Sequence, residues 1–160
     1  MNIESIPIEF PEGANIIFGQ SHFIKTVEDL HEICATATPA MKFGLAFSEA
    51  SGPRLVRHSG NDAVLTQIAA DNMMRLGCGH TFLIIVVDAF PIHVLKAIQA
   101  CPEVCRVFCA SGNSVKALVV RDDQGGGVIG VIDGEKPVGI ETEADQQTRR
   151  EFLRMIGHKL

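Results

Sequence analysis

The segment from Gly19 to Lys25 holds the most concentrated set of side chains that could bind an anion. Gln20, Ser21 and His22 can each donate a hydrogen bond, and Lys25 adds a positive charge. The segment lies directly before an expected helix, whose N-terminus carries unpaired N–H groups and a partial positive charge. The sequence therefore predicts a phosphate-binding loop here. The alternative is an ordinary strand-to-helix connection with a solvated lysine.

A second group of polar residues follows an apolar run in the first half of the chain. Glu49 leaves that run, and a carboxylate beside a buried strand needs a cationic or metal partner. Arg57 and His58 would point to opposite faces of a strand, so at most one of them can join a given site. Asn61 and Asp62 stand where a helix is expected to begin. Either residue could cap that helix instead of binding a ligand.

Glycines at positions 125, 127 and 130 satisfy the pattern G-x-G-x-x-G. That pattern binds dinucleotides where a strand precedes it and a helix opens at its end. Here Val128 to Asp133 continue with a β pattern, so a dinucleotide fold is excluded. Gly125 and Gly127 could still let backbone N–H groups approach a ligand, and a plain hairpin turn is the equal alternative.

One histidine and a run of cysteines complete the candidates. His80 stands next to Gly79 before an apolar strand, a position where ligands often bind, although a hydrogen-bonded structural histidine is the alternative. Cys101, Cys105 and Cys109 recur every four residues but lack the paired C-x-x-C spacing of a metal site. We therefore expect packed, free thiols in a reducing cytosol.

The 160-residue chain is 46% hydrophobic and 21% charged, which predicts a single domain over residues 1–160. Its net charge of −5, its scattered basic residues and its lack of Trp and Tyr argue against nucleic acid or an anionic membrane as partner. The first residues do not form a signal peptide. The longest apolar stretch, Phe82 to Val87, is far shorter than the ~18 residues of a membrane helix. We therefore expect a cytoplasmic protein.

Alternating β-type and helix-type periods predict an α/β (or α+β) domain with a mixed β-sheet flanked by about four helices. Strands are expected near 3–10, 14–19, 42–49, 54–58, 81–87, 104–110, 115–121 and 127–133. Helices are expected after Thr26, from Asn61 or Asp62, from Pro91 and after Thr142, with capping boxes at both threonines. The fully apolar run 81–87 predicts a central strand covered on both faces.

Several segments also follow one another as in a known family. They are Gly19–Leu30, Lys42–Phe47 with Glu49–Gly52, Arg54–Arg57, Gly60–Asp62, Gly79–Phe82, Ala89–Pro91 and Gly127–Gly134. In this order they resemble the small prokaryotic adenosine-specific kinases, also described as adenosine monophosphate-protein transferases. The resemblance covers roughly residues 13–158 of this chain.

The resemblance implies an α/β fold that assembles into homotrimers. It also implies a site for adenosine or an adenine nucleotide (AMP, ADP or ATP), with phosphoryl or adenylyl transfer as the activity. Two segments depart from the family pattern. Gly125 to Gly127 stand where members often have an arginine between the glycines, and Ser111 to Ser114 replace a Thr-Ala-Asn-Pro run. If that arginine contacts phosphate, its absence argues against transfer.

Two functions of different classes follow. The first is an enzyme that transfers a phosphoryl group to adenosine, with ATP and Mg²⁺. Lys25 and Arg57 would neutralise phosphate charge, His22 or His80 would donate hydrogen bonds or act as a base, and Glu49 or Asp62 would hold Mg²⁺. The expected catalytic residues are thus His22, Lys25, Glu49, Asp62 and His80, and the expected nucleotide-binding residues are Gln20, Ser21, Lys25, Arg57, Asn61, Gly125 and Gly127. The second is a protein that binds or senses the nucleotide between subunits without turnover. A third hypothesis, a thiol-based redox or metal protein, is supported only by the cysteine count.

Overall fold

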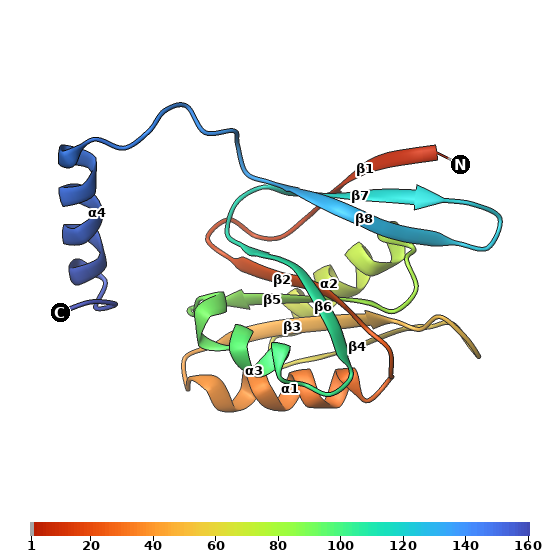
Figure 1. Ribbon diagram of the computed structural model, residues 1–160. Helices are drawn as coiled ribbons and strands as arrows, with labels where there is room; N and C mark the ends of the chain where they lie inside the picture. The colour runs from red at the N-terminus through yellow and green to blue at the C-terminus, as the bar shows by residue number, and fades with distance from the viewer. Residues whose placement is uncertain (1) are drawn as a thin grey trace.

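The computed structural model describes residues 2–160 of the chain, which form two β-sheets and four α-helices (Figure 1). In chain order the elements are β1 (Asn2–Ile8), β2 (Asn15–Ser21), α1 (Thr26–Ala37), β3 (Lys42–Ser48), β4 (Val56–Gly60), α2 (Ala63–Leu76), β5 (Thr81–Val87), a 3₁₀ turn (Pro91–His93), α3 (Leu95–Gln99), β6 (Val104–Ser111), β7 (Val115–Arg121), β8 (Gly126–Asp133) and α4 (Glu143–Met155). No helix among these residues has both the length and the apolar character that spanning a bilayer requires.

The larger sheet has five strands in the order β4-β3-β5-β2-β6, and the smaller has three in the order β1-β7-β8. Every pair of neighbouring strands runs antiparallel. The α/β class with four helices is therefore confirmed, but the strands form two antiparallel sheets instead of one mixed sheet. A fully apolar strand indicates burial on both faces, but it does not indicate the direction of the neighbouring strands. Antiparallel sheets can provide that burial as well as a parallel sheet can.

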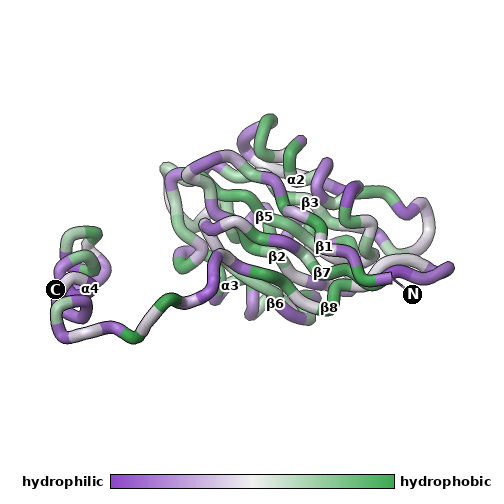
Figure 2. The backbone as a smooth tube through the Cα atoms, turned by 90° about the horizontal axis from the view of Figure 1, so that it is seen from above, coloured by the Kyte–Doolittle hydropathy of each residue, from purple (hydrophilic) through white to green (hydrophobic). Residues whose placement is uncertain are grey.

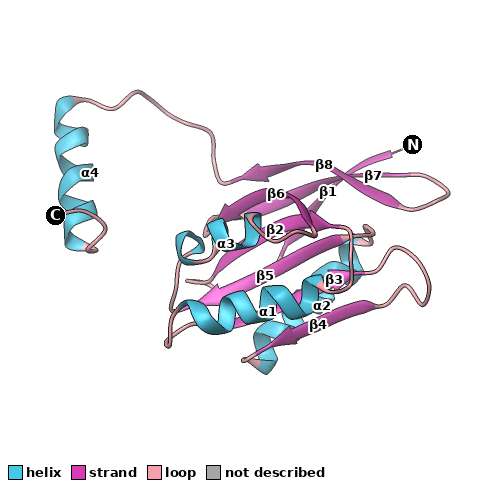
Figure 3. Cartoon of the chain, turned by 60° about the horizontal axis from the view of Figure 1, so that its bottom comes forward, coloured by secondary structure: helices cyan, strands magenta, loops and turns pink. Residues whose placement is uncertain are grey.

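Strand β5 lies at the centre of the larger sheet, as its sequence predicts. Phe82 and Ile84 pack on the face covered by α1 and α3, whereas Leu83 and Ile85 pack on the face covered by α2 and the smaller sheet. Figure 3 shows α1 and α3 on one face. Figure 2 shows the hydrophobic character of the central strands and the mixed character of α4.

Local signals fix the ends of two helices. Asp62 caps α2 by accepting the Leu65 N–H, and Gly77 ends α2 in the left-handed conformation that glycine adopts easily. Thr142 and Asp145 form the capping box expected at the start of α4. These three ends are placed as the sequence predicts.

The capping box expected at Thr26 is absent. Helix α1 begins at Thr26 without a side-chain cap, and the Thr26 hydroxyl instead donates to the Phe23 carbonyl. The N–H groups of Thr26 and Val27 already donate to the carbonyls of Phe23 and Ile24. Because a tight turn satisfies these donors, the helix start offers fewer free N–H groups to an anion than the sequence predicts.

Residues 134–142 and α4 stand away from the two sheets (Figure 1). No residue of α4 is buried. The prediction of one domain over residues 1–160 stays a prediction.

Candidate ligand-binding cleft

A cleft of about 660 Å³ opens between three segments that are distant in sequence. They are the end of β3 with the loop after it (48–56), the end of α2 with the turn after it (73–79), and the β7–β8 hairpin (120–127). Its volume is within the range of small-molecule sites, which is roughly 300–1,000 Å³. The lining combines aliphatic and methionine side chains with hydroxyl, carboxylate and guanidinium groups.

The hairpin is fixed against the end of α2. Arg121 donates to the carbonyls of Leu76 at 2.7 Å and Gly77 at 3.4 Å. A Cβ added to Gly126 would lie 3.0 Å from the Cys78 Sγ and 2.7 Å from the Arg121 guanidinium. The backbone of the hairpin can therefore approach α2 only because residue 126 has no side chain.

Gly125 and Gly127 flank this contact and line the cleft. A Cβ on either residue would meet no atom within 4 Å, so both face open space. Strand β8 runs directly from Gly126 to Asp133 without a helix, which confirms the exclusion of a dinucleotide-binding loop. The glycines form a plain hairpin that also forms a wall of the cleft.

Ser48 provides a polar group with no partner inside the protein. Its residue is 6% exposed and lines the cleft, and its Oγ has no hydrogen-bond partner among residues 2–160. A buried hydroxyl without a partner costs stability, so such groups in native proteins usually meet a ligand or water. Sequence reasoning missed Ser48. The available signal was a hydroxyl directly after the apolar run Phe43–Phe47.

Glu49 joins the ends of β3 and β4. Its carboxylate accepts the Leu55 N–H at 2.8 Å and the Arg57 Nε and Nη2 at 3.0 and 2.9 Å. The Leu55 N–H, and then the Arg57 guanidinium, hold the pKa of Glu49 below its usual value. Glu49 thus has the cationic partner that the sequence requires, and Arg57 is largely neutralised before any phosphate arrives.

Arg54 is the cation of the cleft that remains available. It lies in the loop between β3 and β4 with a φ of 54°, an uncommon conformation for a residue with a side chain. Its guanidinium is exposed and forms no hydrogen bond or ion pair within the described part of the chain, and the residue lines the cleft. A strained residue beside a cavity is a frequent feature of ligand sites.

Lys25 lies outside this cleft. Its ammonium pairs with the Asp29 carboxylate at 2.5 Å, which raises the lysine pKa, and its side chain is 55% exposed. The Ser21 hydroxyl is buried and bonds to the Thr26 hydroxyl and the Glu103 carbonyl. None of residues 19–25, where the phosphate-binding loop is predicted, lines the cleft, and the Lys25 and Ser21 side chains instead stabilise the connection into α1.

His80 joins the ends of three neighbouring strands through its backbone. Its carbonyl accepts the Ser21 N–H at 2.9 Å, and its N–H donates to the Ser48 carbonyl at 2.7 Å. Its ring stacks on Phe47, on the face of β3 opposite to Ser48. His22 is exposed at the same end of the sheet. Gln20 pairs in register within β2 and is half-buried.

Asn61 and Asp62 lie at the other end of the β3–β4 pair. The Asn61 amide accepts the Phe43 N–H at 2.8 Å and donates to the Met41 carbonyl at 2.9 Å, and Asp62 caps α2. Both therefore have structural partners. Since β3 and β4 separate Asp62 from Glu49, the two carboxylates cannot share one Mg²⁺.

A family model described as adenosine specific kinase matches residues 6–159. The chain belongs to the adenosine-specific kinase family. This membership confirms the resemblance drawn from the sequence.

The fold of this chain is also similar to that of a protein whose crystal structure has been solved. The crystal structure of the PH1918 protein from Pyrococcus horikoshii OT3 superposes with a TM-score of 0.94 at 42% identity, over 99% of this chain and 98% of that one. None of the curated proteins compared with the chain matches it.

This adenosine-specific kinase family member also contains a pair of carboxyl groups beside Lys25. Glu103 is 3% exposed, and its side chain meets that of Asp29. Burial first, and then the hydrogen bond with Asp29, raise the pKa of Glu103, whereas the Lys25 hydrogen bond lowers that of Asp29. Burial and the neighbouring Asp29 carboxylate therefore favour the protonated form of Glu103, whose Oε1 has no hydrogen-bond partner within residues 2–160. The Cys101 thiol lies within 4.8 Å of both carboxylates, and all five cysteines are free.

Replacing Glu103 by glutamine is expected to stabilise the protein increasingly as the pH rises from 4.5, the ordinary pKa of the group, to neutral. A raised native pKa means that the folded state binds the proton more tightly, so wild-type stability falls as the pH rises through this range. Glutamine keeps the donor at every pH. Thermal unfolding measured along a pH series checks this. A constant difference between Glu103→Gln and wild type would contradict it, and the exposed Glu28→Gln serves as control.

Proposed function

We propose that the protein binds adenosine or an adenine nucleotide in the cleft and transfers a phosphoryl group from ATP to adenosine. The observation that carries the proposal is the unpartnered Ser48 hydroxyl, which lines the same cavity as the unpaired Arg54. A donor or acceptor without a partner and a cation without a counter-ion together suit a ligand that has a sugar and phosphates.

Each part of a nucleotide has a complementary surface in the cleft. Leu55, Val56 and Met73 give an apolar surface for the base, Ser48 can bond to the ribose, and Arg54 can hold phosphate oxygens. Phosphoryl transfer needs little covalent help from a protein and depends mainly on positioning and charge neutralisation. These residues would supply both.

Mg²⁺ is the cofactor that this chemistry implies. Asp122 and Glu49 are the carboxylates that line the cleft. Asp122 uses only its Oδ1 to accept the N–H groups of Gln124 and Gly125, which leaves Oδ2 for a metal. One or two carboxylates together with phosphates and water suffice for Mg²⁺, which would neutralise charge on the phosphates. Asp62 is too distant to take part.

The direct test is to incubate the protein with ATP, adenosine and Mg²⁺ and to separate the nucleotides by chromatography. The γ-phosphoryl group would leave ATP and join an adenosine hydroxyl, so ADP and AMP should appear in equal amounts. Thermal stabilisation by adenosine or ATP without product would instead support the nucleotide-binding alternative. If the ligands cause no thermal stabilisation and no product forms, both the phosphoryl-transfer proposal and the nucleotide-binding alternative are wrong.

A larger residue at Gly127, in the wall of the cleft, is expected to reduce this stabilisation. Gly127→Val adds a branched side chain whose Cβ meets no protein atom within 4 Å, so the strand should remain folded while the approach of the ligand is hindered. Gly130→Val is the matched control, since Gly130 also lies in β8 and faces open space but does not line the cleft. Melting curves with and without adenosine or AMP measure the effect. Equal ligand-induced shifts in both variants would place the ligand elsewhere.

A further inference from the structure

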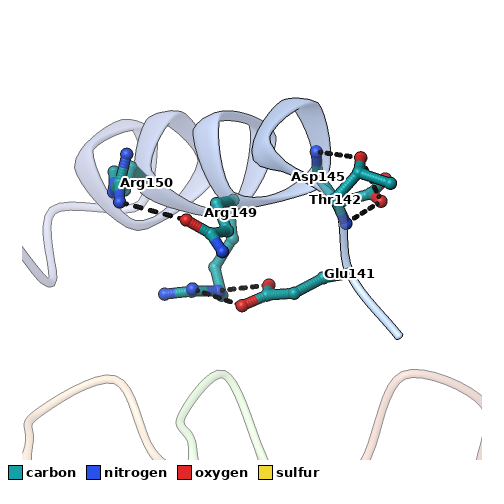
Figure 4. A network of polar contacts seen from close by, with 6 residues as sticks. Glu141, Thr142, Asp145, Arg149 and Arg150 are labelled. Carbon is teal, nitrogen blue, oxygen red and sulfur yellow. Dashed lines mark hydrogen bonds and ion pairs between the residues drawn. The ribbon is translucent and has the colours of Figure 1, made fainter.

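Two polar atoms of buried side chains lack a hydrogen-bond partner among residues 2–160. One is the Ser48 Oγ in the cleft, and the other is the Glu103 Oε1, which belongs to a residue that is 3% exposed. Figure 4 shows the usual arrangement at Glu141, whose two oxygens accept from the Arg149 guanidinium at 3.2 and 2.9 Å. A buried carboxyl oxygen without a partner costs stability, so Glu103 needs a group that the folded chain does not supply.

The Glu103 side chain is part of a cluster of three possible metal ligands. The cluster consists of Asp29, Cys101 and Glu103, whose ligand atoms all lie within 4.8 Å of one another. Asp29 lies on α1, whereas Cys101 and Glu103 flank Pro102 in the connection between α3 and β6. Within residues 2–160 no other His, Cys, Asp and Glu side chains form such a group of three. The buried carboxyl group without a partner therefore faces two further ligand atoms.

Hydrogen bonds hold the two segments of the cluster together. The Glu103 carbonyl accepts the Ser21 hydroxyl at 2.8 Å and the His22 N–H at 3.1 Å, just before the helix whose first turn carries Asp29. Lys25 donates to the Oδ2 of Asp29, which leaves Oδ1 as a ligand atom. Carboxylates that bind metals usually accept such a hydrogen bond on their other oxygen. The cluster is thus positioned by contacts that do not themselves need a metal.

The ligand types favour zinc. Zn²⁺ binds thiolate and carboxylate groups together, whereas Mg²⁺ takes oxygen ligands. In a tetrahedral site with bonds of about 2.3 Å to sulfur and about 2.0–2.2 Å to oxygen, the ligand atoms lie about 3.3–3.8 Å apart. Atoms that are separated by up to 4.8 Å therefore need to approach by about 1.5 Å at most. Three protein ligands leave the fourth position of the ion to water.

Charge and access also suit a divalent cation. Two carboxylates and a thiolate carry three negative charges, and the Lys25 ammonium beside them carries one positive charge. A divalent ion makes the whole group neutral, which buried charges require. The Asp29 side chain is 20% exposed and Cys101 is half-buried, so an ion can reach the ligands from solvent.

We propose that Asp29, Cys101 and Glu103 bind one Zn²⁺ ion, which links α1 to the start of β6. The ion would replace the thiol proton of Cys101 and the carboxyl proton of Glu103, and both protons pass to solvent. None of the three residues lines the cleft, so this site does not depend on the proposed nucleotide binding. The C-x-x-C rule does not find it, because that rule applies to ligands within one segment.

The test is a titration of chelator-treated protein with Zn²⁺, followed by calorimetry. Wild type is expected to bind one equivalent. Cys101→Ser and Glu103→Gln are each expected to weaken binding at least on the order of 100-fold, since even changes outside the ligand set weaken it roughly 10–100-fold. Glutamine keeps the shape of the side chain, and circular dichroism should show both variants folded. Cys105→Ser removes an exposed thiol outside the cluster and is the matched control, which should bind like wild type.

Co²⁺ in place of Zn²⁺ identifies the sulfur ligand directly. A bond between Co²⁺ and a thiolate gives a charge-transfer band in the near ultraviolet, which we expect in wild type and in Cys105→Ser but not in Cys101→Ser. Excess Mg²⁺ should not displace Zn²⁺ from wild type. A wild type that does not bind Zn²⁺ would overturn the proposal. Wild-type affinity in either Cys101→Ser or Glu103→Gln would do so as well, because it would show that the ion is held by other side chains.

Discussion

Gly44→Ala is expected to prevent stable folding. A Cβ at position 44 would lie 2.1 Å from the Thr66 backbone N and 2.2 Å from the Leu65 carbonyl carbon, distances that no real Cβ contact shows. Both atoms belong to the backbone of α2, so no side chain can turn aside to relieve the clash. The added methyl group must push the helix off the sheet.

The clash is severe because α2 packs directly on two glycines of the larger sheet. Gly44 on β3 pairs with Gly60 on β4, and a Cβ at Gly60 would lie 2.3 Å from the Thr66 Oγ1. The first turn of α2 therefore packs directly on backbone. Displacing the first turn of α2 would also create a cavity between α2 and the larger sheet, where Leu65, Ala69 and Met73 are buried.

We expect a loss of more than about 4 kcal/mol, which is a large part of the ~5–15 kcal/mol that stabilises a domain. Chemical denaturation followed by circular dichroism measures it. Gly130→Ala is the matched control, since its Cβ would meet no atom within 4 Å, and it should change stability little. A Gly44→Ala variant as stable as Gly130→Ala would show that α2 does not rest on this glycine pair.

Much of the fold could be predicted because its signals are local. The apolar run of β5, the Asp62 cap, the Gly77 stop and the capping box at Thr142 each depend on a few consecutive residues, and each is confirmed. The sheet pairing could not be predicted in this way. It depends on contacts such as β1 with β7, where Asn2 pairs with Arg121 from the far end of the chain.

The cleft was only partly predictable for the same reason. Glu49, Gly125 and Gly127 were candidates and do line it, but Ser48 gains significance only when α2 and the hairpin leave its hydroxyl buried and unpartnered. The ion pair of Lys25 with Asp29 could have been predicted from the sequence. The two residues are four positions apart at the start of a helix, which is a spacing that favours such pairs.

Arg54→Ala is expected to weaken binding of AMP or ATP ten- to hundredfold while leaving adenosine binding largely intact. A charge-assisted hydrogen bond contributes about 1.5–3 kcal/mol, and adenosine has no phosphate to accept it. Arg54 makes no contact that supports the fold beyond its own backbone turn, where its N–H donates to the Ser51 carbonyl. The variant should therefore melt like wild type without ligand. Isothermal titration with the nucleotide and with adenosine measures both effects.

Two cations elsewhere show whether charge at the cleft, and not net charge, causes the effect. Arg106→Ala removes an exposed guanidinium on β6, and Lys25→Ala removes the ammonium that pairs with Asp29. Neither residue lines the cleft, so both variants should bind AMP like wild type. If Lys25→Ala weakens AMP binding and Arg54→Ala does not, the phosphate binds at the start of α1, as the sequence predicts. The unpaired guanidinium beside Ser48 would then require another explanation.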